Sequence, residues 1–132
     1  MSNWRDIDTS TPEGLHELNK VIAQRLSDSL LVFFEVDNGL SGIEIHSHRI
    51  DRDEPWFVVP NYSTVTDNAL KLVRNLPKGF QFLFRNRPKG YWTAGIQCKY
   101  DSSKDSFAKS ESPAIAICLA WLGHGDIQAV QK

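Results

Sequence analysis

Leu30–Val36 reads LLVFFEV and is the stretch of this sequence that decides the fold. Its apolar side chains stand at consecutive positions, whereas a strand with one face in water would alternate apolar and polar residues. We therefore expect a central β-strand that is covered on both faces. A sheet with a layer on either side is the architecture that provides such cover.

The segment before this strand predicts an amphipathic helix. Residues 10–13 combine a capping hydroxyl with an early proline, which is typical of a helix start. Beyond them, apolar residues recur at spacings of three and four and form one stripe: Leu15, Leu18, Ile22 and Leu26. We expect this stripe to pack on the sheet.

Further strands are expected from alternating or short apolar segments. They lie at residues 42–48, 56–59, 80–85 and 92–100, with a short edge strand around Phe107. Residues 80–85 and 92–100 predict an antiparallel hairpin, because a turn-rich loop joins two alternating runs.

Two more helices complete the expected fold. Ser63 or Thr64 can cap a helix that runs to about Leu76. Ser112-Pro113 opens a well-buried helix that ends at Gly123. We predict the α+β class, with about three helices and about five to six strands in an antiparallel sheet between helical layers, an α/β/α sandwich.

Length and composition indicate one small globular domain. The 132 residues are 41% hydrophobic and 11% aromatic, which is enough to form one core without disulfides or a structural metal. We expect a single domain over residues 11–123, with flexible segments at 1–10 and 124–132. Cys98 and Cys118 lie in apolar segments without CxxC spacing, so reduced thiols are favoured over a disulfide or a zinc site.

Charge and hydropathy exclude some classes of partner. A net charge of -1 argues against nonspecific binding to nucleic acid or to anionic lipid. The sequence contains neither a signal-peptide pattern nor an apolar stretch of about 20 residues that would span a bilayer. We expect a cytoplasmic protein, in the cytoplasm of the host cell if a phage encodes it, with no membrane partner.

Three segments together resemble a known family. They are Pro60-Asn61-Tyr62-Ser63-Thr64 at a helix start, Trp92 with Ala94 in a later strand, and the closing run from Ala114 to Ala120. This pattern resembles the phage ABA sandwich domains, small proteins of phages and prophages, over roughly residues 56–122. The resemblance implies an antiparallel sheet between helical layers, and it implies little about activity.

Asn61-Tyr62-Ser63-Thr64 is the first candidate ligand site. Hydroxyls and free backbone amides meet there at an expected helix N-terminus, where the partial positive charge suits phosphate or carboxylate. An ordinary helix cap is the alternative, because Ser and Thr are preferred caps with or without a ligand.

The loop of the expected hairpin is the second candidate. Arg85, Arg87 and Lys89 are followed closely by the aromatic Tyr91 and Trp92, a mixture that can clamp a nucleotide by phosphate pairing and base stacking. The alternatives are a solvated turn, and a core position for Trp92. If the two candidates meet across the sheet, they form a small anionic-ligand pocket.

Other chemistry has weaker support in the sequence. Glu44, His46 and His48 share one strand face, but without a further ligand at diagnostic spacing, apart from Asp51 or Asp53, we expect no metal. The GxSxG, P-loop, GxGxxG and HExxH motifs are all absent from the sequence. We expect neither a cofactor nor catalysis, and a metal-dependent hydrolase ranks far behind the other hypotheses.

Two functional hypotheses remain. In the first, a phage-type accessory protein binds a small anionic ligand without turning it over, and sequesters a nucleotide signal of the host's antiviral immunity. In the second, a module without a small-molecule ligand binds a host or phage protein, or assembles with itself through a strand edge or an apolar patch.

Overall fold

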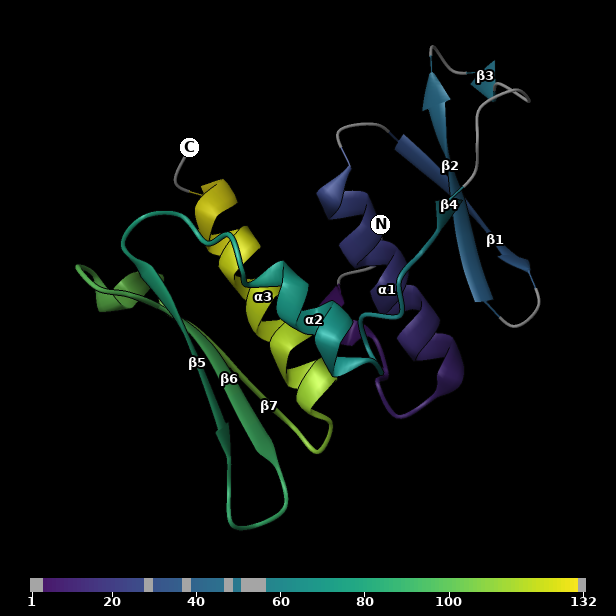
Figure 1. Cartoon of the computed structure of the whole chain (residues 1–132). Coiled ribbons are helices and arrows are strands. Elements are labelled where there is room, and N and C mark those ends of the chain that lie inside the picture. Colours follow the sequence, from purple (N-terminus) through teal and green to yellow (C-terminus); the bar gives the residue numbers. More distant parts are fainter. Residues whose placement is uncertain (1–3, 28–29, 37–38, 47–48, 51–56, 131–132) are drawn as a thin grey trace. The chain divides into compact units, whose positions relative to one another are not determined.

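The computed structural model describes residues 4–27, 30–36, 39–46, 49–50 and 57–130. Within these residues the chain contains three α-helices and seven strands, two of them only two residues long, in two antiparallel sheets (Figure 1). The predicted α+β class is therefore confirmed. The chain divides into two compact units, Met1–Asn61 and Tyr62–Lys132, and each is described by itself.

The first unit begins with helix α1 (Pro12–Leu26), which follows a 3-10 turn at Trp4–Asp6. The predicted start is confirmed, because Thr11 is the N-cap and its Oγ1 accepts a hydrogen bond of 3.0 Å from the Gly14 amide. Leu18 and Ile22 of the expected stripe are fully buried, whereas Leu26 is 53% exposed. The apolar stripe is thus one turn shorter than the spacing predicted.

The first sheet contains β1 (Leu30–Val36), β2 (Gly39–His46), β3 (Arg49–Ile50) and β4 (Phe57–Val58). β2 is its central strand, because it pairs with each of the other three. β1 pairs with β2 alone among the described strands, so the prediction that β1 is central was wrong.

The burial of β1 explains this error. Leu31 is buried, Phe33 and Phe34 are half-buried, and Leu30 is 64% exposed. A run of apolar residues indicates that the side chains of a strand are buried, but it does not identify the neighbouring strands with which that strand forms hydrogen bonds. Here β1 pairs with β2, the next strand in the sequence, as sequential antiparallel strands usually do.

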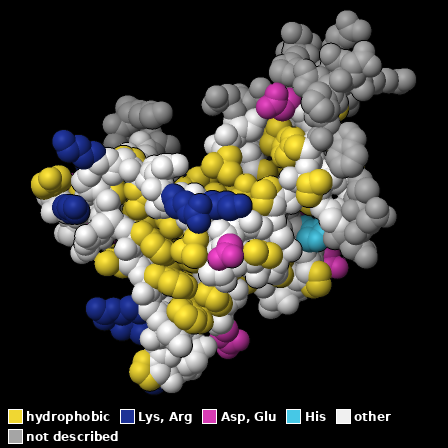
Figure 2. All heavy atoms as spheres, viewed as in Figure 1, with side chains coloured by type: hydrophobic (Ala, Val, Ile, Leu, Met, Phe, Trp, Pro, Cys, Tyr) yellow, Lys and Arg dark blue, Asp and Glu magenta, His cyan; other side chains and the backbone are white. Residues whose placement is uncertain are grey.

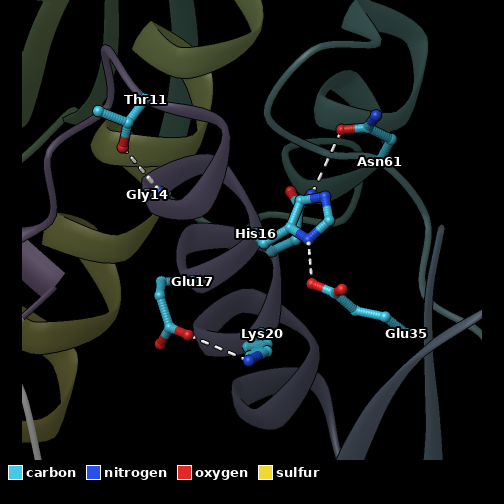
Figure 3. A network of polar contacts seen from close by, with 8 residues as sticks. Thr11, Gly14, His16, Glu17, Lys20, Glu35 and Asn61 are labelled. Atoms are coloured by element: carbon cyan, nitrogen blue, oxygen red, sulfur yellow. Dashed lines mark hydrogen bonds and ion pairs between the residues drawn. The ribbon is translucent and has the colours of Figure 1, made fainter. Parts of the chain in front are cut away.

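Polar contacts join α1 to the sheet and to the end of this unit (Figure 3). His16 Nδ1 lies 3.2 Å from Glu35 Oε1 of β1. The amide of Asn19 donates to Asn61 Oδ1 over 3.3 Å. The exposed pair of His16 and Glu35 contributes little stability by itself, whereas Asn19, only 4% exposed, finds a partner for its buried amide in Asn61.

The second unit contains the sheet β5-β6-β7, formed by β5 (Phe80–Asn86), β6 (Trp92–Cys98) and β7 (Ser106–Ser110), with a 3-10 turn at Ser102–Lys104. The predicted hairpin and the edge strand around Phe107 are both confirmed. Among the described residues, these strands pair only with one another, so the expectation of one sheet was wrong in this respect. Each β-strand pairs instead with a neighbour close in sequence, which costs less loop-closure entropy.

Helix α3 (Pro113–Val130) packs against β6 and β7 and against the short helix α2 (Thr66–Leu72) (Figure 1). One face of the sheet is buried under α3: Ala94 and Ile96 are fully buried, and Ser106 Oγ donates to the Ala120 carbonyl over 2.8 Å. The expectation of a well-buried third helix is confirmed.

The predicted end of this helix at Gly123 was wrong. α3 continues to Val130, and His124, which we expected in a flexible tail, is only 6% exposed. Gly123 lies so close to Ser106 that a Cβ there would overlap the Ser106 hydroxyl. The glycine therefore permits close packing of helix on strand, which outweighs its weak helix propensity.

Candidate functional site

The segment from Asn61 to Thr64 does not form the expected helix N-terminus. The N-cap of α2 is Val65, without a side-chain cap, and the helix has seven residues and ends at Leu72. The prediction that Ser63 or Thr64 caps a helix reaching Leu76 was wrong. Residues 62–64 form a turn, so the first helical residue is Thr66.

Tyr62 and Ser63 are buried parts of the second unit, 8% and 0% exposed. The Cys118 thiol of α3 donates to the Tyr62 carbonyl over 3.3 Å. Burial, and secondarily the nearby Cys118, raises the pKa of the Tyr62 hydroxyl, and burial raises the pKa of the Cys118 thiol to about 12. Tyr62 and Ser63 thus belong to the buried part of this unit, whereas Asn61 and Thr64 are exposed.

Both cysteines are free, as predicted. Cys118 is buried and Cys98 is half-buried, so only the first is a full member of the core. A thiol with so high a pKa stays protonated and is a poor nucleophile. Cys118 therefore adds no nucleophile to a candidate site.

The face of sheet β5-β6-β7 that points away from α3 carries a regular pattern of side chains, and we call it the outer face. Strand alternation places on it Gln81, Leu83, Arg85, Thr93, Gly95, Gln97, Phe107 and Lys109. The register aligns these residues in three rows across the strands.

The middle row of the outer face is apolar and hollowed. Leu83 pairs with Gly95, which pairs with Phe107, and the two large side chains are 41% and 61% exposed. The Phe107 ring lies against the backbone of Gly95, since a Cβ at that position would overlap two ring atoms. An open hollow of about 510 Å³ covers this row and its neighbours.

The next row supplies positive charge. Arg85 pairs with Thr93, which pairs with Lys109, and Arg87 from the hairpin loop donates from Nε to Thr93 Oγ1 over 3.2 Å. The Lys109 ammonium also lies 5.7 Å from the centre of the Tyr91 ring. In Figure 2, dark-blue Lys and Arg side chains lie on the surface of the second unit, in the region that Figure 1 draws as sheet β5-β6-β7.

The lining of the hollow has three cationic residues and no carboxylate. None of the three is paired with a carboxylate in the part of the chain that the structure describes. The third row is neutral, with Gln81 donating to Gln97 over 2.8 Å. An anion that approaches the row of Arg85 and Lys109 therefore meets no like charge within the lining.

Only some of the predicted site residues line the hollow. Arg85 and Arg87 line it, whereas Lys89 lies exposed in the turn and does not. Trp92 points to the opposite face, where it is half-buried and stacks on Phe84 with ring centres 4.8 Å apart. The other predicted segment, Asn61 to Thr64, does not line the hollow either.

Sequence reasoning missed Leu83, Phe107 and Lys109 as site residues. The signal was present, because the alternation that placed Phe80, Phe82 and Phe84 on one face places Leu83 on the other. The pairing of β7 with β6 was needed to bring Phe107 and Lys109 next to them.

Other kinds of site find no support among the described residues. They contain no group of three or more His, Cys, Asp and Glu side chains that could hold a metal. His48 and the side chain of His46, with which the metal hypothesis was built, lie outside the described residues, as do Asp51 and Asp53. Within the same described part of the chain, every helix is too short or too polar to cross a bilayer.

Comparisons with family models, with curated proteins and with solved structures found no match for this chain. The resemblance to phage ABA sandwich domains stays a prediction.

Proposed function

We propose that this protein binds a small anionic ligand on the outer face of sheet β5-β6-β7 and does not transform it. The observation that carries the proposal is the hollow itself, where Arg85, Arg87 and Lys109 lie beside an apolar floor and no carboxylate lines the hollow. Guanidinium groups bind phosphate and carboxylate through parallel hydrogen bonds, and an apolar floor strengthens such bonds by excluding water.

In the finer form of this proposal, the chain is a phage-type accessory protein that sequesters a nucleotide signal of host immunity. The support is the segment resemblance together with basic residues beside an exposed aromatic ring. Binding without chemistry is sufficient for sequestration, so the role demands neither a nucleophile nor a catalytic base.

A thermal-shift screen against inorganic pyrophosphate, ADP-ribose, and mono-, di- and cyclic nucleotides tests the proposal. A ligand well above its dissociation constant should raise the melting temperature by several degrees. For any probe that binds, Arg87→Ala should weaken the affinity about tenfold or more, because it removes a charged hydrogen-bond donor. The recovered probe should be chemically unchanged by mass spectrometry.

Lys89→Ala is the matched control, because it removes the same charge from the same loop outside the hollow. It should leave the affinity within about twofold, since an exposed charge contributes little. The proposal fails if no probe shifts the melting curve, or if Lys89→Ala weakens binding as much as Arg87→Ala does.

Self-assembly through a strand edge is the second candidate. β5 and β7 each pair on one side only among the described strands, and Leu83 and Phe107 beside these edges are exposed. Unpaired edges present a row of amides and carbonyls to another chain. Sedimentation of the purified protein would support this candidate if it shows dimers that Phe107→Lys disperses, and a monomer at all concentrations would contradict it.

A further inference from the structure

The rows of the outer face define what the ligand must offer beyond its negative charge. Resting on the proposed anion site, we propose that the ligand is a free nucleoside phosphate, with its base stacked on Phe107 and its phosphate held by Arg85, Arg87 and Lys109. The binding mode follows from the shape of the floor, the spacing of the rows and the sign of the charges.

Phe107 has the position that a stacking platform requires. Its ring lies down on the backbone of Gly95, and 61% of its surface remains exposed. Leu83 lies on the other side of Gly95 in the same row, so the Phe107 ring and Leu83 together form an apolar floor. A planar base stacked on the exposed side of the Phe107 ring covers apolar surface of this floor.

The spacing of the rows fits a nucleotide. The cationic row lies two residues along the strands from the apolar row, which corresponds to about 7 Å at the usual strand rise. The base and the 5′-phosphate of a nucleotide are separated by a ribose, a span of the same order. A ligand with charge alone, such as pyrophosphate, can occupy only the cationic row.

The charges indicate a free nucleotide rather than a nucleic-acid strand. Arg85 and Lys109 share one row at one end of the hollow, and a net charge of -1 for the chain argues against nonspecific binding along a polymer backbone. Stacking does not read hydrogen-bonding groups of the base, so adenine, guanine and cytosine nucleotides should bind with similar affinity.

Calorimetry with AMP, ribose 5-phosphate and a short oligodeoxyadenylate tests this binding mode. AMP should bind about tenfold or more tighter than ribose 5-phosphate, the difference that stacking of one base provides. Phe107→Leu should abolish this difference, because it keeps apolar volume but removes the flat ring. Phe107→Tyr, which keeps the ring, should preserve it, and the melting curves of both variants confirm that they are folded.

The outcomes separate this inference from the proposed function. Equal affinity for AMP and ribose 5-phosphate overturns the stacked base but leaves the anion site intact. Weak binding of both by the wild-type protein, at millimolar concentration, overturns both. An oligodeoxyadenylate that binds more than about tenfold tighter than AMP overturns the free nucleotide in favour of a single strand.

Discussion

His124 is a buried polar side chain without a complete set of partners. It is 6% exposed, it packs edge to face with the Phe80 ring at 4.7 Å between ring centres, and its Nδ1 has no hydrogen-bond partner among the described residues. Burial lowers the pKa of this imidazole below the ordinary value of 6.5. The folded protein therefore holds it neutral, whereas the unfolded chain protonates it near pH 6.5.

This depressed pKa predicts acid sensitivity. Because the unfolded state binds the extra proton first, stability should be full above pH 6.5 and should fall as the pH drops from 6.5 to the lower folded-state pKa. Thermal melts at pH 8 to 5 of wild type and His124→Leu measure the effect. The stability difference between the two should shift in favour of the variant below pH 6.5, and a difference that stays constant over this range would contradict the assignment.

At the scale of elements, the contact between Gly123 of α3 and Ser106 of β7 sets how closely helix and strand pack. A Cβ at residue 123 would overlap the Ser106 hydroxyl, which donates to the Ala120 carbonyl. Alanine is favoured over glycine inside a helix by about 1 kcal/mol, so propensity and packing act in opposite directions here.

We expect packing to win in Gly123→Ala, with a loss of about 1–2 kcal/mol in the free energy of unfolding. In the Ser106→Ala background the same change should be neutral or stabilising by up to about 1 kcal/mol, because only an ordinary contact with Cβ of residue 106 remains. Urea denaturation of the four proteins of this cycle measures the coupling. A Gly123→Ala cost that is the same in both backgrounds would show that the hydroxyl is not the obstacle.

The same glycine shows where sequence reasoning ends. Caps and alternation act locally, so Thr11, the start of α3 and the β5–β6 hairpin were all predicted correctly. Gly123 indicated a helix end only because its tertiary partner was invisible in the sequence. Likewise, β1 was predicted to be central because a run of apolar residues indicates burial, but such a run does not give the order of the strands in the sheet.

In the candidate site, too, the residues with a local signal in the sequence were predicted, and those that depend on tertiary contacts were not. Arg85 and Arg87 were found because charge clustered in one loop is visible in the chain. Phe107 and Lys109 were missed because they reach the outer face only through the pairing of β7 with β6. Tyr62 and Ser63 looked available to a ligand, yet both are buried, and Tyr62 contacts Cys118 of α3, 56 residues later in the sequence.

At the scale of the whole molecule, the chain consists of two compact units that meet in sequence between Asn61 and Tyr62. The second unit has its own sheet, a helix that covers one face of it, and fully buried side chains from both: Ala94, Ile96, Ile117 and Leu122. It also contains every residue that lines the hollow of the outer face. The single domain expected over residues 11–123 stays a prediction.

A fragment of residues 62–132 tests whether the second unit depends on the first. Because α3 packs on β6 and β7 within this unit, we expect the fragment to fold alone, with a helical circular-dichroism signal and cooperative unfolding. Its stability should be modest, since a domain of this size buries a smaller fraction of its surface. A coil-like spectrum without a transition would instead show that residues 1–61 complete its core, and the single-domain prediction would then gain its first direct support.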